Sequence, residues 1–231
     1  MITAYGPETG DVIVIAQKVV SKAEGRIVAL ETVAVSAEAQ ALAINTGKDP
    51  RVVELVLSES KRIVRAAPGL MIVEHRLGYI MANAGIDASN TGGDDQVILL
   101  PEDPDRSAAE LARAIEQQTG ARVAVIISDS WGRPWRLGTV GFAIGLAGLP
   151  ALVDMRGEAD LDGRPLQATS IGHGDELAAA ASLLMGQAAE GRPVVVIRGL
   201  STTGPRDLDG RASDLIRPPE DDLFRQAEAG A

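Results

Sequence analysis

The sequence contains no cysteine and only two histidines, His75 and His173. The first absence excludes disulfides, thiolate catalysis and cysteine-ligated zinc, and it is consistent with a reducing, cytoplasmic environment. The second excludes a histidine-rich metal centre, so a bound metal would be held mainly by oxygen, which favours Mg²⁺ or Mn²⁺. Aromatic residues make up only 3% of the 231 residues, so the core must be built mainly from alanine, valine, leucine and isoleucine.

Long apolar runs and basic charge are also scarce. No stretch approaches the roughly 20 apolar residues of a transmembrane helix, and the first residues lack the basic region that opens a signal peptide. We therefore expect no membrane segment. With 22 basic and 32 acidic residues the formal net charge is -10, which argues against nucleic acid as the main partner. An acidic protein can still bind an anionic substrate when divalent cations lie between its carboxylates and that substrate.

Two common nucleotide-binding motifs are missing. The Thr-Gly-Lys-Asp segment around Lys48 has the wrong upstream spacing for a P-loop, and an aspartate replaces the serine or threonine that would bind Mg²⁺. Residues 138–145 (GTVGFAIG) lack the first Gly-x-Gly of the dinucleotide fingerprint. A nucleotide would therefore need another kind of site.

Hydrophobic periodicity predicts a mixed α+β (α/β) protein without repeats or a long linker. A helix after residues 99–105 is expected to start with a capping box formed by Ser107 and Glu110, and to end at Gly120. The other expected helices are residues 37–45, 52–60, 138–148 and 175–189, and the expected strands are residues 11–16, 26–35, 71–74, 79–82, 123–127 and 194–197.

A polar segment, residues 83–90 (NAGIDASN), directly follows an apolar strand. It offers the Asp87 carboxylate, a hydroxyl and two amides, which are groups that suit a contact with a metal-bound phosphate. The alternative is an Asx-turn, in which Asp87 and Asn90 only satisfy local backbone donors. Taken alone, the segment is more typical of the turn.

A second segment, residues 123–136 (VAVIISDSWGRPWR), runs from an apolar strand into Ser-Asp-Ser. Open α/β sheets bind ligands at the carboxyl ends of their strands, which is where this pattern places Asp129. Arg133 and Arg136 are candidates for binding phosphate or another part of the substrate, because a guanidinium can hold two oxygens at once. The alternative makes Asp129 a helix N-cap, the arginines surface ion-pair partners and the two tryptophans packing residues.

Two weaker segments complete the set of candidates. In residues 17–26, Lys18 and Lys22 follow a strand next to a hydroxyl and a glycine, so they could approach a polyphosphate, although solvated lysines on a turn are commoner. Residues 185–191 (MGQAAEG) are more typical of a helix C-terminus than of a nucleotide contact.

Together and in this order, the motifs resemble those of the coenzyme F-420:L-glutamate (gamma-glutamyl) ligase family. The similar segments are VSKAEGR, NAGIDASN, LLPEDPD, ISDSWGRP with FAIGLAG, RGEADLDGRPL, and DELAAAASLLMGQAAEG with RPPEDDLF. The resemblance covers almost the whole chain and indicates one ligase domain over residues 1–231. ISDSWGRP and NAGIDASN are its most specific motifs.

The resemblance implies an enzyme that transfers phosphate from GTP to a carboxylate of the F-420 precursor. The amine of L-glutamate then displaces the phosphate and forms an amide. Two divalent cations, Mn²⁺ or Mg²⁺, are implied, together with K⁺. The implied fold is a two-lobed α+β subunit that intertwines with a second copy as a homodimer, with the nucleotide near the interface. No catalytic nucleophile is implied.

The resemblance also implies roles for particular residues. Asp87 and Asp129 would be metal ligands, and Ser130 and Gln187 would lie at the second metal. The residues that would contact the nucleotide are Gln17, Ser21, Lys22, Asn90, Met185, Gly186, Ala188 and Glu190.

Two expectations come from the ends of the sequence. Family members usually have a further strand and a Gly-Asp-Asp-Leu-like segment before the point where this sequence opens. Either the start of the sequence is truncated, or the nucleotide site is incomplete. No flavin-binding domain follows RPPEDDLF, so no FMN is expected. The alternatives are a catalytically silent nucleotide-binding or assembly subunit, and a related ligase with a different acid or amino acid.

Overall fold

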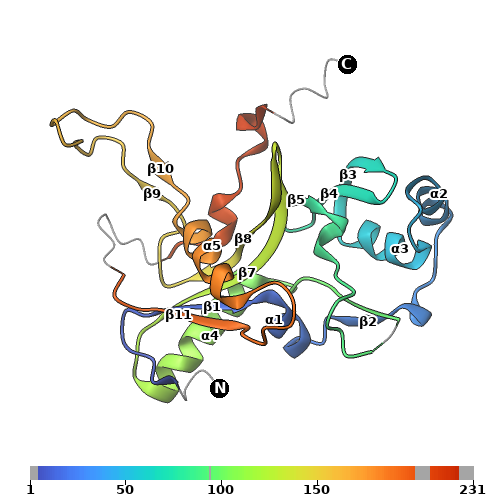
Figure 1. Ribbon diagram of the computed structural model, residues 1–231, viewed down its shortest axis with the longest axis horizontal. Coiled ribbons are helices and arrows are strands. Elements are labelled where there is room, and N and C mark those ends of the chain that lie inside the picture. Colours follow the sequence, from blue (N-terminus) through green and yellow to red (C-terminus); the bar gives the residue numbers. More distant parts are fainter. Residues whose placement is uncertain (1–4, 94, 201–208, 224–231) are drawn as a thin grey trace.

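The computed structural model describes residues 5–93, 95–200 and 209–223. The protein has the predicted mixed α+β fold. Figure 1 shows β1, β7, β8 and β11 with helices α1, α4 and α5 on one side of the molecule, and α2, α3, β3 and β4 gathered on the other. Within the described ranges, no helix combines the length and the apolar character needed to cross a bilayer.

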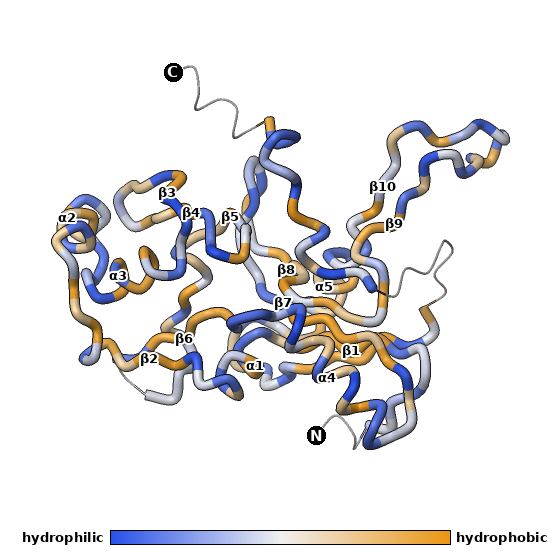
Figure 2. Tube along the Cα trace, turned by 180° about the vertical axis from the view of Figure 1, so that it is seen from behind, coloured by the Kyte–Doolittle hydropathy of each residue, from blue (hydrophilic) through white to orange (hydrophobic). Residues whose placement is uncertain are grey.

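The central sheet has the strand order β11-β1-β7-β8. Only β1 and β7 are parallel, and the other two pairings are antiparallel. Helix α5 packs against one face of this sheet, and α1 and α4 pack against the other. Because both faces are covered, β1 reads as a continuous apolar run, which is visible in Figure 2. The bounds are β1 Val12–Ala16, β7 Ala124–Arg133, β8 Arg136–Ala147, β11 Val194–Ile197, α1 Gln17–Ala23, α4 Pro104–Thr119 and α5 His173–Met185.

The second part of the molecule has a hydrophobic cluster of its own. Helices α2 (Ala37–Thr46) and α3 (Pro50–Ser58) pack on an antiparallel sheet of β3 (Ser60–Ala67), β4 (Leu70–His75) and β5 (Ile80–Ala82). Ser36 caps α2 and Asp49 caps α3, so both helices lie within two residues of the predicted ranges. The sequence did not predict β3, which is half exposed and carries several basic residues.

Short elements connect these parts. Only residues 27–29 of the expected strand at residues 26–35 form a strand, because a 3₁₀ turn follows at once. Strands β9 and β10 form the base of a long arm that projects from the body in Figure 1. The short elements are β2 Ile27–Ala29, β6 Gln96–Ile98, β9 Val153–Asp154, β10 Ser170–Ile171, and the 3₁₀ turns η2 Leu30–Thr32, η3 Asn83–Gly85, η4 Ala212–Leu215 and η5 Pro219–Asp221.

The predicted helix at residues 138–148 is wrong, because this segment is strand β8. Its glycines allow helices to approach the sheet from both sides. A Cβ on Gly141 would lie 2.6 Å from the carbonyl oxygen of Ala178 in α5, and one on Gly145 would collide with Pro104 of α4. These small residues therefore serve packing within the subunit.

Two predicted helix boundaries also need correction. Helix α4 starts at Pro104, and its N-cap is Asp103, whose carboxylate accepts a hydrogen bond from the Arg106 amide at 3.1 Å. Ser107 lies inside the first turn, so the predicted capping box is wrong, whereas the predicted end at Gly120 is confirmed. Helix α5 ends at Met185 rather than at residue 189, because Gly186 has φ +75°.

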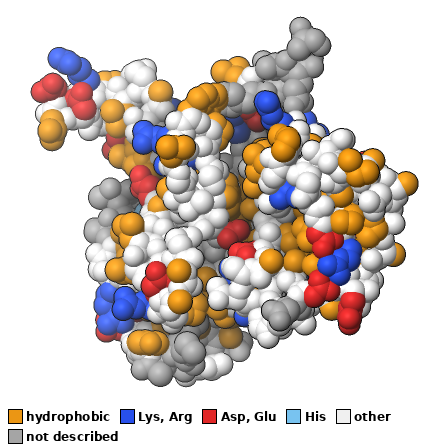
Figure 3. Space-filling view, turned by 45° about the vertical axis from the view of Figure 1, so that its right-hand side comes forward, with side chains coloured by type: hydrophobic (Ala, Val, Ile, Leu, Met, Phe, Trp, Pro, Cys, Tyr) orange, Lys and Arg blue, Asp and Glu red, His pale blue; other side chains and the backbone are white. Residues whose placement is uncertain are grey.

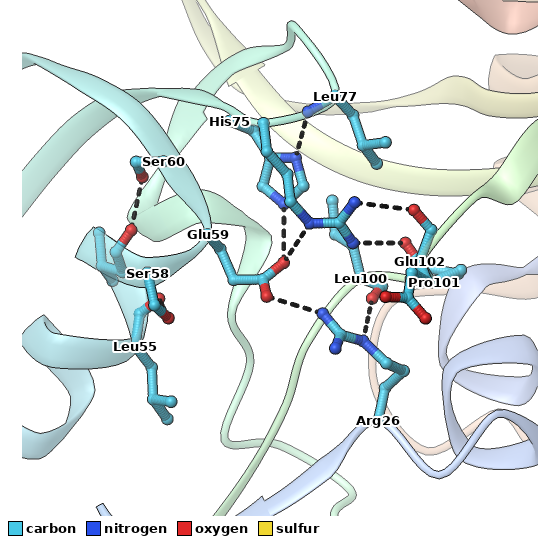
Figure 4. A network of polar contacts seen from close by, with 12 residues as sticks. Arg26, Leu55, Ser58, Glu59, Ser60, His75, Leu77, Leu100, Pro101 and Glu102 are labelled. Atoms are coloured by element: carbon cyan, nitrogen blue, oxygen red, sulfur yellow. Dashed lines mark hydrogen bonds and ion pairs between the residues drawn. The ribbon is translucent and has the colours of Figure 1, made fainter. Parts of the chain in front are cut away.

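A network of buried charges joins the two parts (Figure 4). Glu59, at the end of α3, accepts hydrogen bonds from Arg26 at 2.8 Å and from Arg76 at 3.0 Å. Arg26 also donates to the carbonyl of Leu100 at 3.0 Å, which ties the network to the chain entering α4. Although burial raises the pKa of Glu59, neighbouring His75 and the two arginines outweigh it and hold that pKa at about 2.

Candidate functional site

The main cleft lies where the parallel strands β1 and β7 reach the same edge of the sheet. Ala16 ends β1 opposite Ser128, whereas β7 continues to Arg133 as a hairpin with β8. The chain after β1 turns into α1 and leaves this part of β7 open, as expected for the carboxyl ends of parallel strands. The cleft has a volume of about 660 Å³ and is lined by parts of residues 16–22, 87–90, 128–130 and 182–193. Figure 3 shows the surface hollowed between the two halves of the molecule, with acidic side chains near the middle of the hollow.

The structure gathers most of the predicted site residues in this cleft. Ser21 is fully buried and donates to Gln17 Oε1 at 2.8 Å, so it supports a cleft residue without lining the cleft itself. Arg133 donates to the Gly138 carbonyl at 3.1 Å in the β7–β8 hairpin, and Arg136 is exposed there; neither lines the cleft. The predicted residues that line it are Gln17, Lys22, Asp87, Asn90, Asp129, Ser130, Met185, Gly186, Gln187, Ala188 and Glu190.

Asp87 is held by the backbone and presents one carboxylate oxygen to the cleft. Its amide and carbonyl pair with those of Ile98. One oxygen, Oδ1, accepts a hydrogen bond from the Ser89 amide at 2.6 Å, which is the Asx-turn considered above. The other oxygen, Oδ2, lies 2.7 Å from Lys18 Nζ. The turn and a cation contact therefore use different oxygens of the same side chain.

Lys18 also lines the cleft, although it was not among the nucleotide contacts that the family resemblance implied. Its ammonium also donates to Ser89 Oγ at 2.7 Å. Burial raises the pKa of Asp87, but Lys18 and the Ser89 amide more than offset this and lower it. Lys22 lies one turn further along α1 and donates to the carbonyl of Asn90 at 2.6 Å. Because the two lysines are four residues apart in α1, both lie on one face of this helix.

Asp129 lies inside β7 opposite Phe142, because this strand continues well beyond the predicted residues 123–127, and the alternative N-cap is wrong. Its Oδ1 accepts a hydrogen bond from the Ser130 amide at 2.8 Å. Burial raises the pKa of Asp129 to about 6, and the negative charge of Asp87 adds to the rise. Two carboxylates from distant parts of the chain therefore influence each other across one cleft.

The loop after α5 forms the opposite wall. Ser130 donates from its hydroxyl to Gln187 Oε1 at 2.8 Å, which joins this loop to β7. Glu190 accepts from the Ala188 amide at 2.8 Å and folds back over Gly186, where a Cβ would collide with it. Glycine suits position 186 because φ there is +75°, a conformation that residues with a Cβ rarely adopt.

The cleft is lined by side-chain oxygens of the type that hard divalent cations bind. In the described part of the chain, no three histidine, aspartate or glutamate side chains group closely enough to hold a metal by themselves. The cleft nevertheless brings together the carboxylates of Asp87 and Asp129, the Ser130 hydroxyl and the Gln187 amide oxygen. Phosphate and water oxygens would complete the coordination of Mg²⁺ or Mn²⁺ on such a set.

Comparisons with known proteins agree on one family. Residues 2–199 match the family described as F420-0:Gamma-glutamyl ligase. The chain is 51% identical over 223 residues to the coenzyme F420:L-glutamate ligase of Methanopyrus kandleri, a match that covers 94% of this chain and 86% of the relative. The protein of the same name from Methanothermobacter thermautotrophicus is 51% identical, with 94% and 85% covered. That from Methanocaldococcus jannaschii is 47% identical, with 97% and 88% covered.

Proposed function

Because this chain belongs to the F420-0:gamma-glutamyl ligase family, we propose that it joins L-glutamate to the coenzyme F420 precursor in a GTP-dependent reaction. The names of its relatives support the two substrates to be joined. The single structural observation that carries the proposal is the meeting of Asp87, Asp129 and Lys18 in one cleft. The two carboxylates would bind the metal ion that carries the phosphate, and the ammonium would contact the phosphate itself.

The proposed reaction has two steps. A carboxylate oxygen of the precursor attacks the γ-phosphorus of GTP, the bond to the bridging oxygen breaks, and GDP leaves with that electron pair. The glutamate amine, having lost a proton, then attacks the acyl carbon, so an amide forms and inorganic phosphate leaves. Such phosphoryl transfer needs positioning and charge neutralisation more than a protein nucleophile.

The residues of the cleft divide these tasks. Asp87 and Asp129 would hold one Mg²⁺ or Mn²⁺, and Ser130 with Gln187 would hold the second, with K⁺ as a further cation. When bound, these cations neutralise phosphate charge and polarise the phosphorus that is attacked. Lys18, Lys22 and Arg192 line the same cleft, where they would place positive charge beside the polyphosphate. The α5 loop, residues 185–190, would contact the nucleotide.

Product masses test the function directly. The purified protein is incubated with GTP, Mn²⁺, the precursor and L-glutamate, and we expect the precursor to gain one or more glutamyl residues as GDP forms. A catalytically silent nucleotide-binding subunit would bind GTP and form no product. A ligase for another acid or amino acid would release GDP only when given that other substrate.

We also propose that the subunit forms a homodimer. Residues 155–169 form an arm whose backbone hydrogen bonds run mainly between its own two strands. Leu161 near its tip is fully exposed, and Leu152 at its base is partly so. A second copy of the chain would cover these two leucines.

A further inference from the structure

A second, smaller pocket lies beside the β7–β8 hairpin. Its volume is about 230 Å³. Four segments that are distant in sequence line it: the β4–β5 turn, the hairpin itself, the start of α5, and the chain at residues 215–222. Most of its wall is apolar or aromatic, and the residues that matter here are Tyr79, Ile80, Trp131, Phe142, Leu215 and Ile216.

The aromatic walls of this pocket are fixed by contacts with one another. Trp131 stacks on Phe142 with ring centroids 4.3 Å apart and an angle of 19° between the rings. Tyr79 packs against Trp131 at 5.9 Å and 51°. The Tyr79 hydroxyl donates to the Ile144 carbonyl at 2.8 Å. Its polar atom is therefore already hydrogen-bonded within the protein, and its ring lines the pocket. Rigid ring surfaces of this kind favour a flat, apolar guest.

Polar groups meet the pocket at its edge. Asp175 lies there, with one carboxylate oxygen accepting a hydrogen bond from the Ala143 amide at 2.9 Å. Arg217 and Asp222 complete the lining on the side of residues 215–222. A ring with a polar rim would therefore place its apolar faces against the aromatic walls and its edge atoms near these charges.

The pocket and the main cleft share one face of the hairpin. Asp129 pairs directly with Phe142 across the two strands. Trp131 follows Asp129 by two residues on β7, and the two-residue period of a strand puts both side chains on the same face. Asp129 lines the main cleft, whereas Trp131 and Phe142 line the second pocket. The two sites therefore meet on one face of the hairpin, where Asp129 of the cleft and Phe142 of the pocket are cross-strand neighbours.

Given the ligase function proposed above, we propose that the second pocket binds a planar aromatic ring system at the end of the acceptor remote from its reacting carboxylate. Binding energy from the remote part of a substrate can hold its reacting group in the attacking position. The ring site would therefore fix the carboxylate beside the γ-phosphate, while glutamate and nucleotide bind elsewhere. Trp131 is then a determinant of acceptor specificity that takes no part in metal or nucleotide binding.

Fluorescence tests the site without turnover. The chain has only two tryptophans, so the Trp135→Phe protein carries Trp131 as its sole tryptophan reporter. We titrate this protein with the coenzyme F420 precursor in the presence of EDTA and without GTP. A saturable change in Trp131 emission supports the pocket, and an emission that stays constant while calorimetry detects binding of the precursor overturns it.

Kinetics give the second readout. Trp131→Leu should raise the KM for the precursor at least tenfold and leave the KM for GTP within twofold, whereas Trp131→Phe should stay close to the wild type. Trp135→Leu is the matched control, because Trp135 is 81% exposed and does not line the pocket. A normal precursor KM in Trp131→Leu overturns the inference even when the ligase is active. Where the wild type forms no product, the ligase proposal fails, and the fluorescence titration alone decides the ring site.

Discussion

The ammonium nitrogen of Lys18 lies 2.7 Å from a carboxylate oxygen of Asp87, and its charge also acts on Asp129 across the cleft. Lys18 therefore supplies a positive charge at the place where the proposed divalent cation would bind. In the protein without nucleotide, Lys18 and a free metal ion would compete for the same oxygen. We infer that metal enters this cleft most readily together with the nucleotide, whose phosphates offer Lys18 another partner.

Replacing Lys18 should expose this competition. In Lys18→Met, we expect Mn²⁺ to bind the nucleotide-free protein about tenfold more tightly, a change of roughly 1.4 kcal/mol. Lys22→Met is the matched control, because Lys22 donates to a backbone carbonyl and touches neither carboxylate. Calorimetric titration with Mn²⁺ measures both. Weaker Mn²⁺ binding in Lys18→Met would show that Lys18 does not oppose the metal.

Asp129→Asn should separate activity from stability. The amide is nearly isosteric but lacks the charge, so turnover should fall by more than about 10²-fold. Since burial raises the pKa of Asp129 to about 6, the ionised side chain costs stability at pH 7, and the neutral amide removes that cost. We expect a melting temperature no lower than that of the wild type. A variant that loses activity because it unfolds would contradict this assignment.

The Glu59 network should contribute pH-dependent stability. Glu59→Gln leaves Arg26 and Arg76 without their shared carboxylate, and we expect the unfolding free energy at pH 7 to fall by about 3 kcal/mol. The pKa of Glu59 is about 2 in the folded protein and near 4.5 in the unfolded chain. The network's contribution is therefore complete above pH 4.5 and is lost as the pH falls towards 2.

Urea unfolding of the wild type and Glu59→Gln across this pH range checks the prediction. The difference between the two proteins should shrink steadily below pH 4.5. Glu110→Gln is a suitable control, because Glu110 pairs with Arg106 on the exposed surface of α4. A difference in unfolding free energy that stays constant down to pH 2.5 would mean that the charge of Glu59 does not stabilise the fold.

Light scattering tests the proposed dimer. We expect a mass of about twice 24.1 kDa at micromolar concentration. Leu161→Asp, which places a charge on the exposed part of the arm, should shift the protein towards monomer without changing its melting temperature at low concentration. A wild-type protein that is monomeric under these conditions contradicts the dimer.

The sequence predicted the elements whose local signals agree with their surroundings. Helix α2 has a Ser36 cap and a Gly47 stop, and β1 is an unbroken apolar run, so both were found within about a residue. At α4 two start signals competed, and the Asp-Pro pair at positions 103 and 104 prevailed over the later Ser-x-x-Glu. The first helical position uses no backbone N–H, so proline, which has none, fits there and favours a helix start at position 104.

Other features depend on tertiary packing and could not be predicted from local sequence. The sequence indicated correctly that helices pack closely at Gly141 and Gly145. The glycines themselves, however, belong to strand β8, and the helices that contact them are α5 and α4. The candidate site was found mainly through motif resemblance, since Asp87 and Asp129 lie 42 positions apart and no local pattern links them. Whether Lys18 or Lys22 contacts Asp87 depends on where α1 starts, and no sequence signal fixed that point.

The most direct test of the central claim is the affinity of GTP with and without divalent metal. The cleft has few basic residues and the chain carries a net charge of -10, so bridging cations should provide most of the attraction. Calorimetry should show GTP binding with Mn²⁺ present and its collapse with EDTA, whereas Lys22→Ala should weaken binding less severely. If GTP binds equally well without metal, Asp87 and Asp129 are not bridging ligands and the proposed site is wrong.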